Sequence, residues 1–296
     1  MNIIIGKTSG FCYGVKRAVE NTEQELKKNN KQIYCLGELV HNKDVINELE
    51  QKGLIFIDDI EEARGTTVIR AHGIKKEIYE KAQRNNIDLI DLTCPMVSKI
   101  HMIAEEYENK EYYIFLVGKA NHPEVIGTYS FCGENVSVVE SQKDIKKALE
   151  ELKKSNLKNL LIIAQTTYNL KEFEKIIDLI KNNIDEDIRL EIRNTICLAT
   201  EQRQKETEEL SKNVDLMIIV GGKNSSNTSK LYDISINNCT NVMFVENEKD
   251  IDIRKISEFQ KIGIMAGAST PQNSIERIVE KIKNTDESVK KGEIYA

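Results

Sequence analysis

Three of the six cysteines occupy the same kind of position, directly before a stretch with helical periodicity. They are Cys12, Cys94 and Cys197, which precede residues 15–28, 97–108 and 199–210. The positive end of a helix favours a thiolate, which is the form of cysteine that binds metals. The remaining cysteines are predicted to be buried, unreactive thiols: Cys35, Cys132 and Cys239. The first three therefore indicate a metal site.

Three thiolates suit two kinds of metal centre. One is a zinc ion with a free coordination position, and the other is an iron–sulfur cluster in which one iron lacks a protein ligand. The chain has no Cys-x-x-Cys pair, which argues against a zinc finger, and a reducing cytosol argues against a disulfide framework. Both kinds of centre would leave a position for a substrate.

Polar loops after apolar runs supply a second kind of chemistry. Three of the four histidines lie in such loops, and the matching loops later in the chain carry hydroxyl and amide side chains. These residues are His41, His72, His122, Thr166, Ser225, Ser226, Asn227 and Ser269. Many hydrogen-bond donors in one place suit a phosphate or a diphosphate. No Walker or dinucleotide-binding glycine pattern accompanies them, so nucleotide binding is not expected. The fourth histidine, His101, lies within a helical run and is predicted to be structural.

Glu124 is the only carboxylate in these loops and follows His122 and Pro123. A carboxyl group that is partly withdrawn from water near bound anions has a raised pKa and can carry protons as a general acid. The alternative is a surface glutamate in the first turn of a helix, where acidic residues are common. Taken alone, the residue fits both interpretations equally.

The cysteines and polar loops recur with regular spacing. The first polar residue follows its cysteine by 29, 28 and 28 residues, at His41, His122 and Ser225. The second follows after a further 31, 44 and 44 residues, at His72, Thr166 and Ser269. Such self-similarity is typical of an internal repeat, so we predict three similar α/β units.

Short β-branched and apolar runs alternate with amphipathic stretches, a pattern that predicts an α/β fold with mostly parallel sheets. Strands are predicted near residues 2–5, 32–36, 67–70, 112–117, 159–163, 215–220, 242–245 and 262–265. Ligands of open parallel sheets bind beyond the carboxyl ends of the strands. Every candidate residue is predicted to lie at such an end.

Composition narrows the class of protein. The chain has 296 residues, 40% apolar and 30% charged, which suits a folded globular protein with a large core. Its net charge of −6 argues against nucleic acid as a partner. No segment approaches the roughly 20 apolar residues of a membrane span, and the start of the chain has no leader pattern. We therefore expect a cytoplasmic protein without a membrane partner.

Together the motifs resemble those of the 4-hydroxy-3-methylbut-2-enyl diphosphate reductase family, iron–sulfur enzymes that catalyse the last step of the methylerythritol phosphate route to isoprenoids. The matching segments cover nearly the whole chain: residues 10–15, 39–42, 71–73, 93–95, 122–125, 165–167, 223–227 and 266–269. The order of so many motifs makes the resemblance specific.

The resemblance implies a fold of three α/β domains in a pseudo-threefold trefoil around a central cluster, with domains at 14–95, 96–193 and 194–296 plus 1–13. It implies one 4Fe-4S cluster with three cysteine ligands, Cys12, Cys94 and Cys197, and one open iron. It also implies a diphosphate site, formed by His41, His72, His122, Ser225, Ser226, Asn227 and Ser269. Glu124 would relay protons and Thr166 would position the substrate hydroxyl.

The implied reaction is a reductive dehydroxylation that uses two electrons and two protons, with ferredoxin or flavodoxin as the electron donor and isopentenyl and dimethylallyl diphosphates as products. One rival is quinolinate synthase, another trefoil enzyme with one cluster cysteine per domain, which needs no added reductant. A zinc hydrolase of phosphate esters is a second rival, and a non-catalytic sensor that binds a cluster or an anion is a third. The intact loops at 122–124 and 224–227 favour the reductase.

Overall fold

The computed structural model describes residues 1–28 and 32–290, with side chains described up to residue 284 within the last helix. Residues 291–296, the end of the predicted third domain, lie outside this range. The chain divides into two compact units. We call Met1–Tyr13, His41–Val45 and Leu198–Ala296 the terminal unit, and Gly14–Val40 and Ile46–Cys197 the central unit.

The strands form three sheets, each with four parallel strands. The terminal sheet has the order β1 (Asn2–Ile5), β12 (Lys261–Ala266), β10 (Leu216–Val220), β11 (Val242–Val245). The first central sheet has the order β5 (Leu89–Asp91), β4 (Thr66–Ile69), β2 (Ile33–Leu36), β3 (Leu54–Ile57). The second central sheet has the order β9 (Arg189–Ile192), β8 (Asn159–Ala164), β6 (Tyr113–Val117), β7 (Val136–Val139). The predicted α/β fold with three parallel sheets is therefore confirmed.

The three sheets repeat one arrangement. In each sheet the strand that leads to a candidate cysteine lies at one edge: β1 before Cys12, β5 before Cys94 and β9 before Cys197. The neighbouring strand leads to a polar candidate residue: β12 to Ser269, β4 to His72 and β8 to Thr166. The third strand leads to another polar candidate residue: β10 to Ser225, β2 to His41 and β6 to His122. The repeat inferred from spacing thus corresponds to a repeated strand order, and every candidate residue follows the carboxyl end of a strand.

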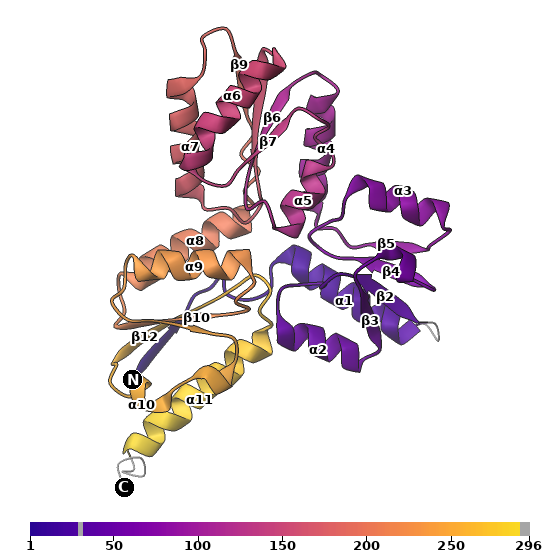
Figure 1. Ribbon diagram of the computed structural model, residues 1–296. Coiled ribbons are helices and arrows are strands. Elements are labelled where there is room, and N and C mark those ends of the chain that lie inside the picture. Colours follow the sequence, from indigo (N-terminus) through magenta and orange to yellow (C-terminus); the bar gives the residue numbers. More distant parts are fainter. Residues whose placement is uncertain (29–31, 291–296) are drawn as a thin grey trace. The chain divides into compact units, whose positions relative to one another are not determined.

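Helices connect the strands. They are α1 (Tyr13–Lys28), α2 (Lys43–Gln51), α3 (Lys76–Arg84), α4 (Pro95–Glu108), α5 (Pro123–Tyr129), α6 (Ile145–Ser155), α7 (Leu170–Asn183), α8 (Leu198–Ser211), α9 (Ser226–Ile236), α10 (Ile253–Ile256) and α11 (Gln272–Lys290). The three predicted to follow cysteines are α1, α4 and α8 (Figure 1). None of the helices in the described ranges is long and apolar enough to cross a membrane.

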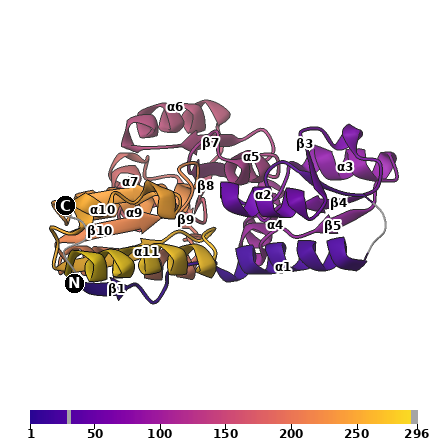
Figure 2. The same ribbon diagram turned by 90° about the horizontal axis from the view of Figure 1, so that it is seen from below.

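Both faces of the two central strands of the terminal sheet, β10 and β12, are buried, which explains why these strands are continuous apolar runs rather than alternating ones. Leu216, Ile218 and Val220 of β10 pack with isoleucines of α11. Figure 2 shows this helix, in yellow, in front of the terminal sheet. Met217 and Ile219 face the other way and pack with residues of α8 and α9. The helices are therefore held against the sheet from which the candidate loops emerge.

Four strands were not predicted: β3, β5, β7 and β9. Each lies at the edge of its sheet, has at most four residues and is partly exposed. An edge strand buries less apolar surface and so gives a weaker periodic signal than a central one. The eight predicted strands are all present, within about two residues of their expected ends.

Candidate metal and anion site

The central unit joins Glu124, Thr166 and Cys197 by hydrogen bonds. The Thr166 backbone N–H and hydroxyl both donate to the Glu124 carboxylate, each over 2.6 Å. The Thr166 carbonyl accepts a bond of 3.0 Å from the Cys197 backbone N–H. The predicted proton carrier, the predicted hydroxyl-positioning residue and a predicted metal ligand are therefore fixed relative to one another.

Glu124 is buried, with 2% of its surface exposed. The alternative interpretation of the sequence, a surface glutamate in the first turn of a helix, is therefore wrong. Burial raises the pKa of Glu124 from the ordinary 4.5 to about 7, although the two bonds from Thr166 act in the opposite direction. The residue lies in the first turn of α5. A carboxyl group with a pKa near 7 can both hold and release a proton at neutral pH.

His122 is the N-cap of α5, and its Nδ1 accepts the Glu124 backbone N–H over 3.2 Å. An imidazole nitrogen that accepts a hydrogen bond carries no proton, so the proton of neutral His122 is on Nε2. The His72 ring lies edge-on to that of His122, with 5.5 Å between centroids. The central unit therefore places two of the three predicted anion-binding histidines together, beside the buried carboxyl group.

His101 supports the loop that carries His72. Its ring stacks on Phe131 with 4.4 Å between centroids, and burial lowers its pKa to about 4. A Cβ at Gly73, whose φ is +75°, would lie 2.8 Å from His101 Cε1. His101 is thus a neutral packing partner, in keeping with the structural role predicted for it.

Cys94 is the N-cap of α4, whose first residue is Pro95. Its backbone N–H donates to the Ala71 carbonyl over 3.0 Å. A Cβ at Gly14 would lie 2.5 Å from Cys94 Sγ, so only glycine leaves room for the sulfur at that point of α1. The Arg17 guanidinium donates to the Thr93 carbonyl over 3.1 Å and ties α1 to the same loop.

In the terminal unit, Cys12 repeats this backbone contact. Its N–H donates to the Ala268 carbonyl over 3.1 Å, next to Ser269. All three candidate cysteines therefore bond to the loop after the neighbouring strand of their own sheet. All three are also reduced and partly exposed, and each stands at the start of a helix.

The other cysteines are different. Cys35, Cys132 and Cys239 are buried, and each thiol approaches a backbone carbonyl within 3.3 Å. Burial raises the pKa of Cys35 and of Cys132 to about 12, which keeps both as thiols. The prediction that these three are buried is confirmed.

Polar groups that lack a partner mark the terminal unit at the start of α9. Ser225 is the N-cap and accepts the Thr228 N–H over 3.3 Å. Asn227 has 3% of its surface exposed, yet neither of its side-chain amide atoms has a hydrogen-bond partner among the described residues. An unpaired buried amide costs free energy that a ligand with suitable polar atoms recovers.

Glycines bring the neighbouring loops close to α9. A Cβ at Gly267 would lie 2.0 Å from the Thr228 hydroxyl oxygen, and one at Gly222 would lie 2.4 Å from the His41 carbonyl oxygen. That carbonyl also accepts a bond of 3.2 Å from the Ser269 hydroxyl. The terminal unit therefore gathers the predicted residues His41, Ser269 and Ser225–Asn227 around one helix N-terminus, a favourable place for an anion.

The residues fit the groups that the sequence predicts. Three reduced, partly exposed cysteines in equivalent places suit a three-thiolate centre, and the space above Gly14 is kept clear for one of the sulfurs. The unpaired Asn227 amide and the hydroxyls at the start of α9 suit a phosphate group.

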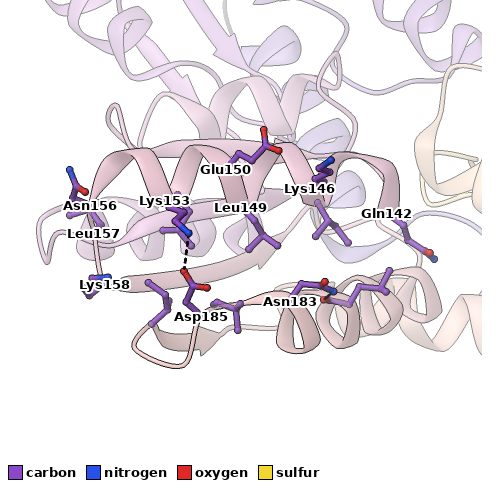
Figure 3. Close-up of a pocket in the computed structure, with 15 residues that line it drawn as sticks. Gln142, Lys146, Leu149, Glu150, Lys153, Asn156, Leu157, Lys158, Asn183 and Asp185 are labelled. Atoms are coloured by element: carbon purple, nitrogen blue, oxygen red, sulfur yellow. Dashed lines mark hydrogen bonds and ion pairs between the residues drawn. The ribbon is translucent and has the colours of Figure 1, made fainter.

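Two hollows lie elsewhere on the central unit. One, of about 670 Å³, lies between α6 and α7 and is lined by residues such as Leu149, Lys153 and Asp185 (Figure 3). None of the predicted site residues lines it. The second, of about 610 Å³, is lined by Val125, Ile126 and Tyr129 of α5, the helix that carries Glu124.

Sequence reasoning missed two residues of α8 that hold the segment before Cys12. Arg203 and Glu206 bond to the backbone of residues 7–10. The sequence identified residues 199–210 only as a helix, because a contact between positions almost 200 residues apart leaves no local pattern.

The chain is similar to known proteins of one family along nearly its whole length. The family model described as "LytB protein" matches residues 3–283. The 4-hydroxy-3-methylbut-2-enyl diphosphate reductase of Thermoanaerobacter sp. (strain X514) is 41% identical over 288 residues, which are 96% of this chain and 97% of the relative.

Two solved structures are also similar. The (E)-4-hydroxy-3-methyl-but-2-enyl diphosphate reductase described as the terminal enzyme of the non-mevalonate pathway has 37% identity and a TM-score of 0.69, over 96% of this chain and 100% of its own. The E-1-hydroxy-2-methyl-but-2-enyl-4-diphosphate reductase of Plasmodium falciparum has 33% identity and a TM-score of 0.86, over 94% and 87%. These findings confirm the resemblance inferred from the motifs, and the chain belongs to the LytB protein family.

Proposed function

We propose that this protein is a 4-hydroxy-3-methylbut-2-enyl diphosphate reductase. It removes the allylic hydroxyl of (E)-4-hydroxy-3-methylbut-2-enyl diphosphate with two electrons and two protons, and it releases water and either isopentenyl or dimethylallyl diphosphate. This is the last step of the methylerythritol phosphate pathway. The observation that carries the proposal is the buried Glu124 carboxyl group, which Thr166 links to Cys197 in a chain 41% identical to a reductase of that name.

Cys12, Cys94 and Cys197 would hold one 4Fe-4S cluster with one iron free of protein ligands. When bound, the cluster supplies electrons and a Lewis-acidic iron for the hydroxyl-bearing end of the substrate. The equivalent backbone bonds of the three cysteines support this assignment, because they hold each thiol at the start of a helix.

The substrate diphosphate would bind to histidine, hydroxyl and amide hydrogen-bond donors. The proposed set is His41, His72, His122, Ser225, Ser226, Asn227 and Ser269. His122 presents its Nε2 proton because Nδ1 is engaged by the α5 backbone. Asn227 offers an unpaired amide inside the protein. Hydrogen bonds in a site withdrawn from water are stronger than the same bonds in solution.

Thr166 and Glu124 would act on the other end of the substrate. Glu124 holds a proton at neutral pH because burial raises its pKa to about 7. Thr166 orients that carboxyl group through two bonds and can turn its hydroxyl toward a substrate oxygen. Delivery of the proton from Glu124 lets the departing hydroxyl leave as water, which is a far better leaving group than hydroxide.

The three domains are proposed at 14–95, 96–193 and 194–296 plus 1–13, which place one sheet in each. A ferredoxin or flavodoxin is proposed as electron donor, and the cytoplasm as the compartment, where both carriers and reduced thiols occur.

The first test is anaerobic purification, followed by determination of iron, sulfide and zinc and by oxidation of a reduced viologen dye with the hydroxymethylbutenyl diphosphate. We expect about four irons per chain and dye oxidation that requires the substrate. Zinc in place of iron would favour the phosphate-ester hydrolase. An intact cluster without substrate-dependent oxidation would exclude the reductase, and turnover without added reductant would favour chemistry like that of quinolinate synthase.

A further inference from the structure

The segment that ends at Cys12 has no regular structure of its own. Residues 6–12 follow β1 and form neither helix nor strand. A ligand on such a segment is only as well placed as the contacts that hold the backbone around it. Within the terminal unit, two side chains of α8 provide many of those contacts.

Glu206 holds the first half of the segment. Its carboxylate accepts the backbone N–H groups of Lys7 over 2.6 Å and of Thr8 over 2.8 Å, and the Thr8 hydroxyl over 2.5 Å. Burial acts to raise the pKa of Glu206, but these three donors outweigh it and lower the pKa below its usual range. The carboxylate is therefore the form that the segment binds.

Arg203 holds the second half. It lies one helical turn before Glu206, and only 3% of its surface is exposed. Its Nε donates to the Thr8 carbonyl over 2.8 Å, and its Nη2 donates to the Gly10 carbonyl over 2.9 Å. Gly10 has a φ of +97°, a left-handed conformation that glycine adopts without strain. The guanidinium thus spans the last backbone turn before Cys12.

Helix α8 begins at Leu198, directly after Cys197. The same helix therefore follows one proposed metal ligand, Cys197, and forms hydrogen bonds with the backbone before another, Cys12. These two cysteines lie 185 positions apart in the sequence. We propose that Arg203 and Glu206 form a clamp that fixes the segment before Cys12 against α8, the helix that follows Cys197, and thereby controls how firmly the metal centre is retained. Both are positioning residues, and the inference rests on the metal centre of the proposed function.

The first experiment uses the full-length apoprotein and measures backbone hydrogen exchange in peptides that cover residues 6–13. Glu206→Gln and Arg203→Met each remove a charged partner of this segment. We expect exchange in this segment to become roughly 10- to 100-fold faster, as the loss of charge-assisted hydrogen bonds predicts. Exchange in β12 should stay at its wild-type rate.

Two matched controls lie on the exposed side of the same helix. Glu209→Gln removes an exposed carboxylate, and Lys205→Met removes a cation that pairs with Glu201. Neither should alter exchange in residues 6–13. If Arg203→Met fails to fold, Thr8→Val removes only the hydroxyl donor of the clamp and should give a smaller increase in the same peptides.

The second experiment measures the rate at which reconstituted, anaerobic protein loses iron to a chelator. We expect faster loss in Glu206→Gln and Arg203→Met, and wild-type rates in both controls. Ile275→Val, a core substitution in α11, controls for a general loss of stability. Iron loss that simply followed the melting temperature across all variants would make the two residues structural and overturn the proposal.

The outcomes separate the two hypotheses. Unchanged exchange in residues 6–13 would show that the clamp does not exist. Faster exchange with unchanged iron loss would show that the clamp does not serve the metal centre. Wild-type protein that binds no iron would overturn the proposed function and with it the clamp's purpose, while the exchange result would still report whether these contacts order the segment.

Discussion

Glu124 and Asn227 occupy the same place in two copies of the repeat. Each is the second residue of the helix that follows the third strand of its sheet, α5 after β6 and α9 after β10. Both side chains are almost completely buried. Both oxygens of Glu124 are bonded to Thr166, whereas the amide atoms of Asn227 have no partner in the described part of the chain.

This difference assigns two kinds of chemistry to one structural position. A buried carboxyl group whose oxygens are engaged by the protein exchanges a proton without having to move. A buried neutral amide without a partner cannot titrate, but it gains hydrogen bonds as soon as a ligand supplies them. The repeat thus fixes the place of each side chain, and in the proposed function the residue type decides whether it would act on protons or bind the ligand.

The largest effect is expected from Glu124→Gln, which keeps the shape and removes the proton. We expect turnover to fall by about 100- to 10,000-fold, the range for loss of a general acid. Iron content should remain that of the wild type because no metal ligand is touched. Steady-state kinetics with reduced viologen and iron analysis are the measurements, and near-normal turnover would remove Glu124 from the proton path.

Asn227→Ala should act on binding rather than on chemistry. Loss of the amide removes ligand bonds, and we expect KM to rise about 10- to 100-fold, with a smaller change in kcat. The apoprotein should be no less stable than the wild type, since an unpaired buried polar group is removed. A fall in kcat with an unchanged KM would contradict the division of roles between Asn227 and Glu124.

The stability of the apoprotein should report the raised pKa of Glu124. Between pH 4.5 and about 7 the folded protein binds a proton that the unfolded chain has released, so the contribution of this group falls as pH rises. Over the whole window it is worth roughly 3 kcal/mol, and above pH 7 it is constant. Denaturant unfolding at several pH values should show this slope in wild type and Asn227→Ala. If the free energy of unfolding of Glu124→Gln depended on pH as strongly as that of the wild type, the pH dependence would not come from Glu124.

The smallest effect is expected from Thr166→Val, whose bulk matches that of threonine. The Thr166 hydroxyl lowers the pKa of Glu124, so its loss should raise that pKa further. Activity that depends on protonated Glu124 falls as pH rises, and the variant's residual activity should fall at a higher pH than that of the wild type. Ser225→Ala, which lies at the other site, should leave the pH profile in place.

Much of this organisation could be predicted because it is encoded locally. A cysteine before a helix and a polar loop after an apolar strand are visible as short patterns, and their repetition revealed three units. The burial of Glu124 was not decidable from its neighbours, since a first-turn glutamate is equally common on a surface. The contacts of Arg203 with residues 8 and 10, and the space that Gly14 leaves for Cys94, depend on chain pairing over long distances. No sequence window contains both partners.

The pairing of β1 with β12 sets the order in which this molecule can be completed during synthesis. The partner of Ile5 is Ile264, so the first strand emerges from the ribosome long before the strand it must join exists. At about 5–20 residues per second, that interval is roughly 13–50 seconds. By the end of that interval the central unit has all of its residues, whereas β1, which leads to Cys12, still lacks its partner strand. A metal centre that needs Cys12 would therefore be completed only once β12 has been made, late in the synthesis of the residues that build the three sheets.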